Sequence, residues 1–155
     1  MRMFWYLLGA VVASGSVMTQ IAWAQHCSAP KNQIFYSSGT SDVPLVGGIK
    51  QAKVLSILCS NTDPSNSYNV QFSIVRDSVT YPLVMINIPA SAGTAPGKPA
   101  KAVVTSGSIP GLPSDAERNP YLILDFSDTL QMATDNGVAN GKRLSCIAIV
   151  CEPPA

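Results

Sequence analysis

The 155-residue chain contains a single histidine, His26, and this scarcity limits the catalytic chemistry open to it. A serine–histidine–aspartate triad uses histidine as its general base, and only His26, close to the N-terminus, is available for that role. A copper site built on an N-terminal histidine needs a second histidine, which the sequence lacks. We therefore expect neither a histidine-dependent nucleophilic site nor a copper site.

Charged residues are also few, at 12% of the sequence, and their signs nearly cancel. Of ten basic and nine acidic residues, one basic residue, Arg2, lies in the N-terminal segment, so the remainder has nine of each and no net charge. No basic stripe suited to nucleic acid and no polybasic membrane patch is present. Weak mutual repulsion instead suits a protein with protein partners, copies of itself among them.

Two further absences bear on metals and carbohydrates. The sequence has no C-x-x-C pair and no D-x-D-x-D-G calcium motif. Because zinc sites usually combine paired ligands about two to four residues apart, we expect no metal and no cofactor. Both tryptophans precede residue 25, so a carbohydrate-stacking surface would depend on Tyr36, Tyr81 or Tyr121.

The N-terminus has the pattern of a secretory signal peptide. A positive start at residues 1–2 precedes an apolar stretch over 3–12, and Ala-Trp-Ala at 22–24 fits the cleavage rule. We expect residues 1–24 to be removed, leaving one extracytoplasmic domain over 25–155, in the periplasm, at the cell surface or secreted. The alternative is an uncleaved membrane anchor, but a spanning helix needs about 20 apolar residues, and polar residues interrupt this stretch after about ten.

The rest of the chain shows a two-residue apolar period rather than a helical one. The sequence YNVQFSIV at 68–75 alternates most clearly, which indicates a strand buried on one face. The expected strands are 32–38, 53–60, 68–75, 79–88, 101–106, 121–126, 129–134 and 143–150. Seven or eight short strands joined by turns predict an all-β protein, an antiparallel, jelly-roll-like β-sandwich.

The connections are rich in glycine, proline and asparagine, as turns require. NTDPSNS at 61–67 predicts a hairpin or a sharp reversal, and 89–99, 107–120 and 135–142 are longer connections. Within 79–88, Pro82 removes a backbone donor, so that strand should lie at a sheet edge or carry a bulge. Residues 114–118 would allow one helical turn at most.

The four cysteines are expected to form two disulfides in an oxidising compartment. If 143–150 is extended, Cys146 and Cys151 lie roughly 16 Å apart at about 3.3 Å per residue, too far for a disulfide. Both remaining pairings tie Cys27 and Cys59 to the last strand. Because antiparallel neighbours place the end of one strand beside the start of the next, we favour Cys59–Cys146 with Cys27–Cys151 over the swapped scheme.

Carboxylates are the remaining catalytic candidates. Asp125 and Asp128 lie three residues apart after a strand, and Asp115 and Glu117 share a loop. A glycosidase needs two carboxylates about 5 to 10 Å apart in a cleft. The surroundings of Asp63, Asp77, Asp128 and Asp135 are typical of turns, however, which favours solvated loop tips. We expect no catalytic residues and keep a carboxylate-dependent hydrolase as an alternative.

Residues 81–150, about half of the expected domain, contain four short motifs: IPASAGT at 88–94, LPSD at 112–115, NPYLIL at 119–124 and VANGK at 138–142. With these motifs the segment resembles small β-sandwich structural subunits of tailed-phage virions. The resemblance implies a role in assembly or attachment, with no catalytic residues to carry over. The signal peptide and the four cysteines depart from that family, whose subunits assemble in the cytoplasm.

These observations predict a non-enzymatic structural or adhesive subunit of a surface or virion-like assembly. A membrane contact would arise only through an uncleaved N-terminal segment. The alternative is a soluble periplasmic or extracellular binding or inhibitor module that recognises its partner with the loops 89–99 and 107–120.

Overall fold

The computed structural model describes residues 31–37, 43–47 and 51–151. The expected signal segment, Cys27 and His26 lie outside these residues. The described part is all β, and no helix in it is long and apolar enough to cross a membrane. Its strands are β1 (Lys31–Ser37), β2 (Val43–Val46), β3 (Ala52–Asn61), β4 (Tyr68–Arg76), β5 (Val79–Ile88), β6 (Lys101–Ala102), β7 (Leu122–Leu124), β8 (Thr129–Thr134) and β9 (Leu144–Cys151).

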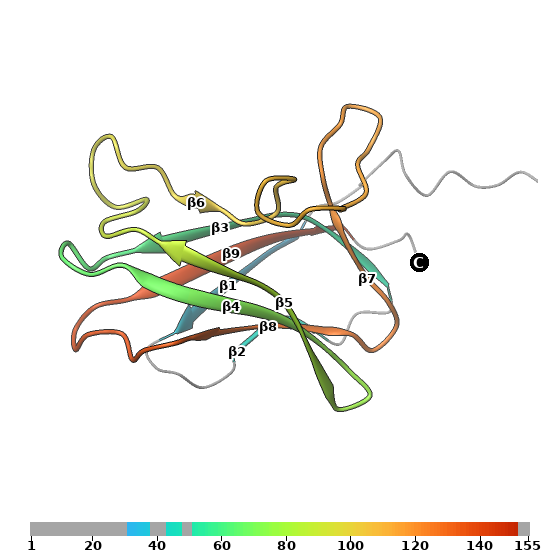
Figure 1. Ribbon diagram of the computed structural model, residues 1–155, viewed down its shortest axis with the longest axis horizontal. Coiled ribbons are helices and arrows are strands. Elements are labelled where there is room, and N and C mark those ends of the chain that lie inside the picture. Colours follow the sequence, from blue (N-terminus) through green and yellow to red (C-terminus); the bar gives the residue numbers. More distant parts are fainter. Residues whose placement is uncertain (1–30, 38–42, 48–50, 152–155) are drawn as a thin grey trace, which may run out of the picture.

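The strands form two antiparallel sheets (Figure 1). In the first sheet the order is β1-β9-β3-β6, and β7 also pairs with β3. β6 and β7 share one position, because β6 pairs with Leu58 and Cys59 while β7 pairs with residues 52–54 at the other end of β3. In the second sheet the order is β2-β8-β4-β5.

The pairing is nested around the β4–β5 hairpin. Moving outward along the chain from that hairpin, β3 pairs with β6 and β7, β2 pairs with β8, and β1 pairs with β9. The chain thus folds as one long double ribbon that rolls into two facing sheets, which is the jelly-roll arrangement of an eight-position sandwich. The predicted fold class, an antiparallel jelly-roll-like β-sandwich, is confirmed.

Alternation along the strands builds the core between the sheets. In β8, Leu130, Met132 and Thr134 are buried while their neighbours are only partly covered, and β9 repeats this pattern with Leu144, Cys146, Ala148 and Val150. This is the two-residue period of a sheet that has one face in the core. The largest fully buried side chain is that of Phe72 in β4.

The β4–β5 hairpin confirms what Pro82 predicts for 79–88. β5 is the last strand of its sheet, and its register against β4 shifts between Phe72 and Ser73, opposite Pro82. The strand is therefore both an edge and a bulged strand. Its two-residue turn, Asp77 and Ser78, has positive φ at both positions, as the twist-matching type I′ turn requires.

Two details of the predicted strand set are wrong. Residues 43–46 form β2, which the sequence reading missed because the segment is short and contains Pro44. The expected strand 101–106 is paired only over two residues. Of the two alternatives for 61–67, the hairpin is excluded because β3 and β4 lie in different sheets. The segment is instead the reversal that carries the chain from one sheet to the other (Figure 1).

A disulfide joins Cys59 of β3 to Cys146 of β9, as predicted. The two residues are direct partners in the β3–β9 register, and their Cα atoms lie 4.1 Å apart. Both side chains are fully buried in the core. Cys151 is disulfide-bonded as well; its predicted partner, Cys27, lies outside the described residues, so that pairing stays a prediction.

We expect the double replacement Cys59→Ala with Cys146→Ala to destabilise the fold by about 2–5 kcal/mol. The bridge closes a segment of 87 residues, so its loss frees much of the unfolded chain. Urea unfolding followed by circular dichroism measures the change in the free energy of unfolding. An unchanged midpoint would show that β3–β9 pairing alone holds the two strands together.

Candidate functional site

Two long connections lie on the same side of the sandwich. Residues 89–100 join β5 to β6, and residues 103–121 join β6 to β7. Both rise beside β3, on the side of the molecule where β6 lies (Figure 1). These are the two loops that the sequence suggests as a recognition surface, and the fold brings them to one side.

Loop 89–100 is held by a buried asparagine at the end of β3. The Asn61 side chain donates to the carbonyl oxygens of Asn66 at 2.8 Å and Pro89 at 3.1 Å. Its backbone N–H donates to Ala92, and its carbonyl accepts from the Thr94 hydroxyl at 2.9 Å. Asn61 is fully buried, so these bonds replace those it would make with water. The loop is thereby fixed to the sandwich at three points.

Asp63, which is buried in the segment after β3, also holds loop 89–100 in place. Its carboxylate accepts hydrogen bonds from the backbone N–H groups of Ser65 and Asn66, from the Asn66 amide and from the Tyr68 hydroxyl, at 2.7 to 3.0 Å. Its carbonyl accepts from the N–H of Ser91. Hydrogen bonds from Asn66 and Ser65 hold the pKa of Asp63 well below its usual range, because they favour the charged carboxylate.

Tyr68 extends this network to a third connection. Its hydroxyl donates to Asp63 at 2.7 Å and accepts from the N–H of Ala139 at 3.0 Å. Burial raises the pKa of Tyr68, and the neighbouring Asp63 carboxylate adds to the effect. Tyr68 therefore stays a neutral donor, and one phenol links the turn after β3 to the connection between β8 and β9.

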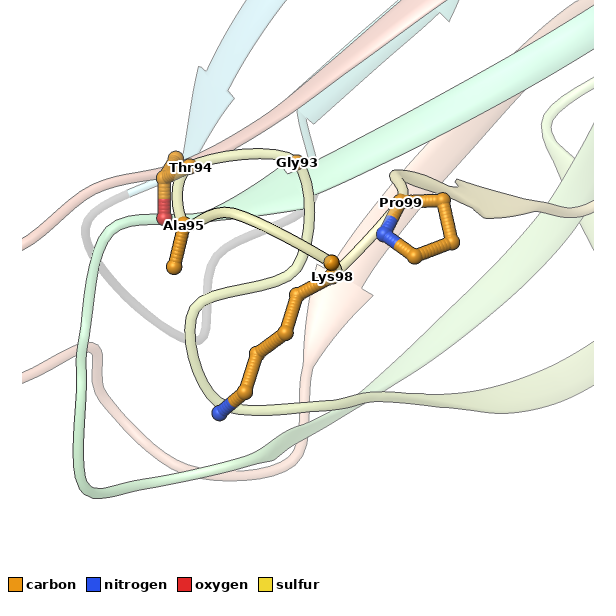
Figure 2. A pocket seen from close by; sticks show the side chains of 6 residues that line it. Gly93, Thr94, Ala95, Lys98 and Pro99 are labelled. Atoms are coloured by element: carbon orange, nitrogen blue, oxygen red, sulfur yellow. The ribbon is translucent and has the colours of Figure 1, made fainter.

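A shallow, open hollow lies on loop 89–100. Gly93, Thr94, Ala95, Gly97, Lys98 and Pro99 line it (Figure 2). The Lys98 ammonium donates to the carbonyl of Ala90 at 3.3 Å, and the Gly93 N–H donates to the carbonyl of Lys98 at 2.7 Å. The loop is closed on itself by these bonds, so the hollow has a fixed shape and carries one cation at its rim.

Gly93 is a position where this loop lies close to β3. Its φ is +72°, and a Cβ built there would lie 2.9 Å from the Cβ of Ser60 and 3.2 Å from that of Ala100. Gly97 has a similar φ of +73° but has open space around the corresponding position. Replacing each of these two glycines by alanine therefore distinguishes the cost of backbone strain, which both share, from the cost of steric contact, which arises only at Gly93.

We expect Gly97→Ala to cost about 1–2 kcal/mol, since an L-residue is strained in the left-handed region. Gly93→Ala should cost more, because the same strain is joined by a clash with Ser60. Urea unfolding of both variants measures the difference. Equal losses would mean that the loop can move away from β3 without penalty.

At the opposite end of β4, Arg76 forms ion pairs with Asp125 and Asp128. Its Nε and Nη2 donate to the two oxygens of Asp128, both at 2.7 Å, and Nη2 also lies 2.8 Å from Asp125. The Asp128 side chain is fully buried, whereas those of Arg76 and Asp125 are about half exposed. Arg76 lowers the pKa of Asp128, and the N–H of Asp125, which donates to the same carboxylate, acts in the same direction.

The prediction of solvated loop tips is therefore wrong for Asp63 and Asp128. Both belong to turns, but both are buried with only 2% of their surface exposed. Their carboxylates satisfy backbone and side-chain donors at the ends of the sandwich, which is why burial is tolerated. Asp77 and Asp135 are exposed, as predicted.

Because the folded pKa of Asp128 is depressed, its contribution to stability is present above the unfolded pKa of about 3.9 and is lost as the pH falls through the lower folded value. We expect Asp128→Asn to lower the free energy of unfolding at neutral pH. The difference in free energy of unfolding between Asp128→Asn and the unaltered protein should become smaller in acid. Urea unfolding at several pH values checks this.

Asp77→Asn is the matched control for Asp128→Asn. Asp77 has a φ of +50° at the hairpin tip, which asparagine tolerates, and it makes no hydrogen bond to another described residue. We expect little change in stability. If the loss of unfolding free energy in Asp128→Asn stayed constant down to acid pH, the stabilising role assigned to the Asp128 charge would be contradicted.

The other candidate residues are not gathered into one site. Asp115 accepts two hydrogen bonds from Asn119 within its own loop, and the Tyr121 ring lies 4.7 Å from the Lys53 ammonium in a cation–π contact. Tyr81 is exposed on β5. Within residues 31–37, 43–47 and 51–151, no group of three or more histidine, cysteine, aspartate or glutamate side chains is placed to hold a metal ion.

Sequence reasoning missed Arg76 as the partner of Asp125 and Asp128. Arg76 lies 49 residues before Asp125, and only the fold shows that the tip of the β4–β5 hairpin meets the turn before β8. No protein-family model matches the chain, and no curated protein matches it.

Proposed function

We propose that this chain is a non-enzymatic structural or adhesive subunit of an extracytoplasmic surface or virion-like assembly. The observation that carries the proposal is the exposed edge strand β5. Val79, Tyr81 and Met85 are exposed by 50%, 54% and 57% on this strand, and none of its ten residues is charged. Edge strands with exposed apolar side chains can pair with other chains. Because Pro82 and the bulge beside it interrupt β5, such pairing would use the parts of the strand on either side of them.

The architecture supports this reading. Jelly-roll sandwiches are a recurring fold of capsid subunits, and the resemblance of residues 81–150 to phage structural subunits implies the same role. A fold is compatible with many functions, so the main support for the proposal is the exposed strand β5 rather than the fold. The charge balance adds support, because neighbouring copies would repel one another only weakly.

The disulfide is compatible with an extracytoplasmic location. A buried, fully formed Cys59–Cys146 bridge suits an oxidising compartment, where such bonds persist. The expected signal peptide points the same way. We therefore infer that assembly takes place outside the cytoplasm.

The proposal predicts that the purified protein forms species larger than a monomer. Size-exclusion chromatography with light scattering, followed by electron microscopy, measures their size across a range of concentrations. We expect Met85→Lys to shift the population toward the monomer, since a lysine on an edge strand opposes pairing with another chain.

Ile123→Lys is the matched control for this experiment. Ile123 is an exposed apolar residue, at 45%, but it lies on β7 in the other sheet. Its replacement adds the same charge and should leave the assembly unchanged. A strict monomer at every concentration, with no partner recovered, would contradict the proposal.

A second candidate function is a binding or inhibitor module. The fixed shape of loop 89–100, tied down by Asn61, favours it, because a preorganised loop loses little entropy when it binds. A strict monomer that captures a partner through loops 89–99 and 107–120 would favour this function over assembly.

The hydrolase alternative receives no support from the carboxylates. A catalytic acid at neutral pH needs a raised pKa, whereas Arg76 lowers the pKa of Asp128. Asp125 and Asp128 are engaged by the same arginine at one end of the sandwich. Their arrangement is that of a structural clamp between the β4–β5 hairpin and the turn before β8.

A further inference from the structure

The connection between β8 and β9 contains the dipeptide Asn-Gly twice, at residues 136–137 and 140–141. Asparagine followed by glycine is the sequence most open to attack of the backbone on the side-chain amide, because glycine has no Cβ to hinder the approach. All four residues are exposed. The two dipeptides differ in backbone conformation and hydrogen bonding.

Asn140 and Gly141 are the central residues of a hydrogen-bonded turn. The N–H of Lys142 donates to the carbonyl of Ala139 at 2.9 Å, and Gly141 has a φ of +73° while Asn140 does not have positive φ. This combination defines a type II turn, in which the first central residue has a ψ of about +120°. That ψ turns the Asn140 side chain away from the Gly141 nitrogen.

Asn136 and Gly137 are held by no comparable bond. Asp135 is anchored before them, since its N–H donates to Asn69 and its carboxylate accepts from the Asn69 amide at 2.8 Å. Ala139 is anchored after them by the Tyr68 hydroxyl. Neither Asn136 nor Gly137 makes a hydrogen bond to another described residue. The dipeptide is therefore an exposed, unbonded bridge between two fixed points.

We propose that Asn136–Gly137 is a site of spontaneous deamidation in the folded protein, and that the turn protects Asn140–Gly141. The Gly137 backbone nitrogen attacks Cγ of Asn136 and forms a cyclic imide. The side-chain nitrogen leaves as ammonia, carrying the proton that the backbone nitrogen gives up. Water then opens the ring at either carbonyl and yields aspartate or isoaspartate. The net change is loss of ammonia and gain of water, with no oxidation or reduction.

The product changes both charge and backbone length. A new carboxylate arises beside Asp135 in a chain whose charges otherwise nearly cancel. The isoaspartate form also adds a methylene group to the backbone between Asp135 and Ala139, which loosens the hydrogen bond from Ala139 to Tyr68. This inference concerns a modification site and does not depend on the proposed assembly function.

Incubation of the folded protein in mildly alkaline buffer, followed by peptide mapping with mass spectrometry, tests the proposal. We expect Asn136 to react several-fold faster than Asn140. In the reduced, urea-unfolded chain, where the turn is lost, the two rates should converge. Equal rates in the folded protein, faster reaction at Asn140, or no reaction at Asn136 while the unfolded chain reacts would each overturn it.

Gly137→Ala provides a variant that keeps the fold. A Cβ at Gly137 has no atom within 4 Å, and its φ is not positive, so alanine fits without strain. We expect it to slow the reaction of Asn136 several-fold while leaving the slow reaction of Asn140 and the circular dichroism spectrum unchanged. An undiminished rate at Asn136 would show that the Gly137 nitrogen is not the attacking group.

Discussion

The pairing of β3 with β9 is the interaction on which the remaining structure depends. These two strands occupy the centre of the first sheet, and each also pairs with an edge strand or strands: β9 with β1, and β3 with β6 and β7. The Cys59–Cys146 bridge fixes their register from within the core. Because β3 and β9 lie far apart in the sequence, with a separation of 87 residues between Cys59 and Cys146, their pairing closes the long double ribbon into a sandwich. The second sheet then has a fixed surface to pack against.

Buried polar groups complete the two ends of the sandwich. At one end, Asn61, Asp63 and Tyr68 tie together the turn after β3, the loop before β6 and the connection before β9. At the other, Arg76 ties the β4–β5 hairpin to Asp125 and Asp128. The buried carboxylates of Asp63 and Asp128 each accept hydrogen bonds from several donors, so the cost of their burial is offset. We propose that the fixed loop at the first end and the exposed β5 edge are the surfaces that bind partners.

Much of the fold could be predicted because residue patterns within single strands determine it. Alternation predicted that β4 is buried on one face, and Pro82 indicated that β5 is an edge strand or carries a bulge. The spacing of Cys146 and Cys151 excluded a bridge between them and led to the pairing of Cys59 with Cys146. Each of these inferences needs only strand geometry and the residue itself.

The parts that escaped prediction depend on contacts distant in sequence. A turn-like sequence around Asp63 or Asp128 does not reveal that the turn is packed under a neighbouring loop. Arg76 could be assigned to Asp128 only once β4 and β8 were known to be adjacent. β2 is short and contains a proline, so its pairing with β8 rests on tertiary context rather than on its own pattern.

Hydrogen–deuterium exchange on the oxidised, native protein tests the central role of the β3–β9 pair most directly. The strands that hold the fold together should open only with global unfolding and so exchange slowest. We expect the slowest amides in β3 and β9, around Cys59 and Cys146, with faster exchange in the edge strand β5 and in residues 135–143. Exchange in β3 and β9 as fast as in β5 would contradict the account.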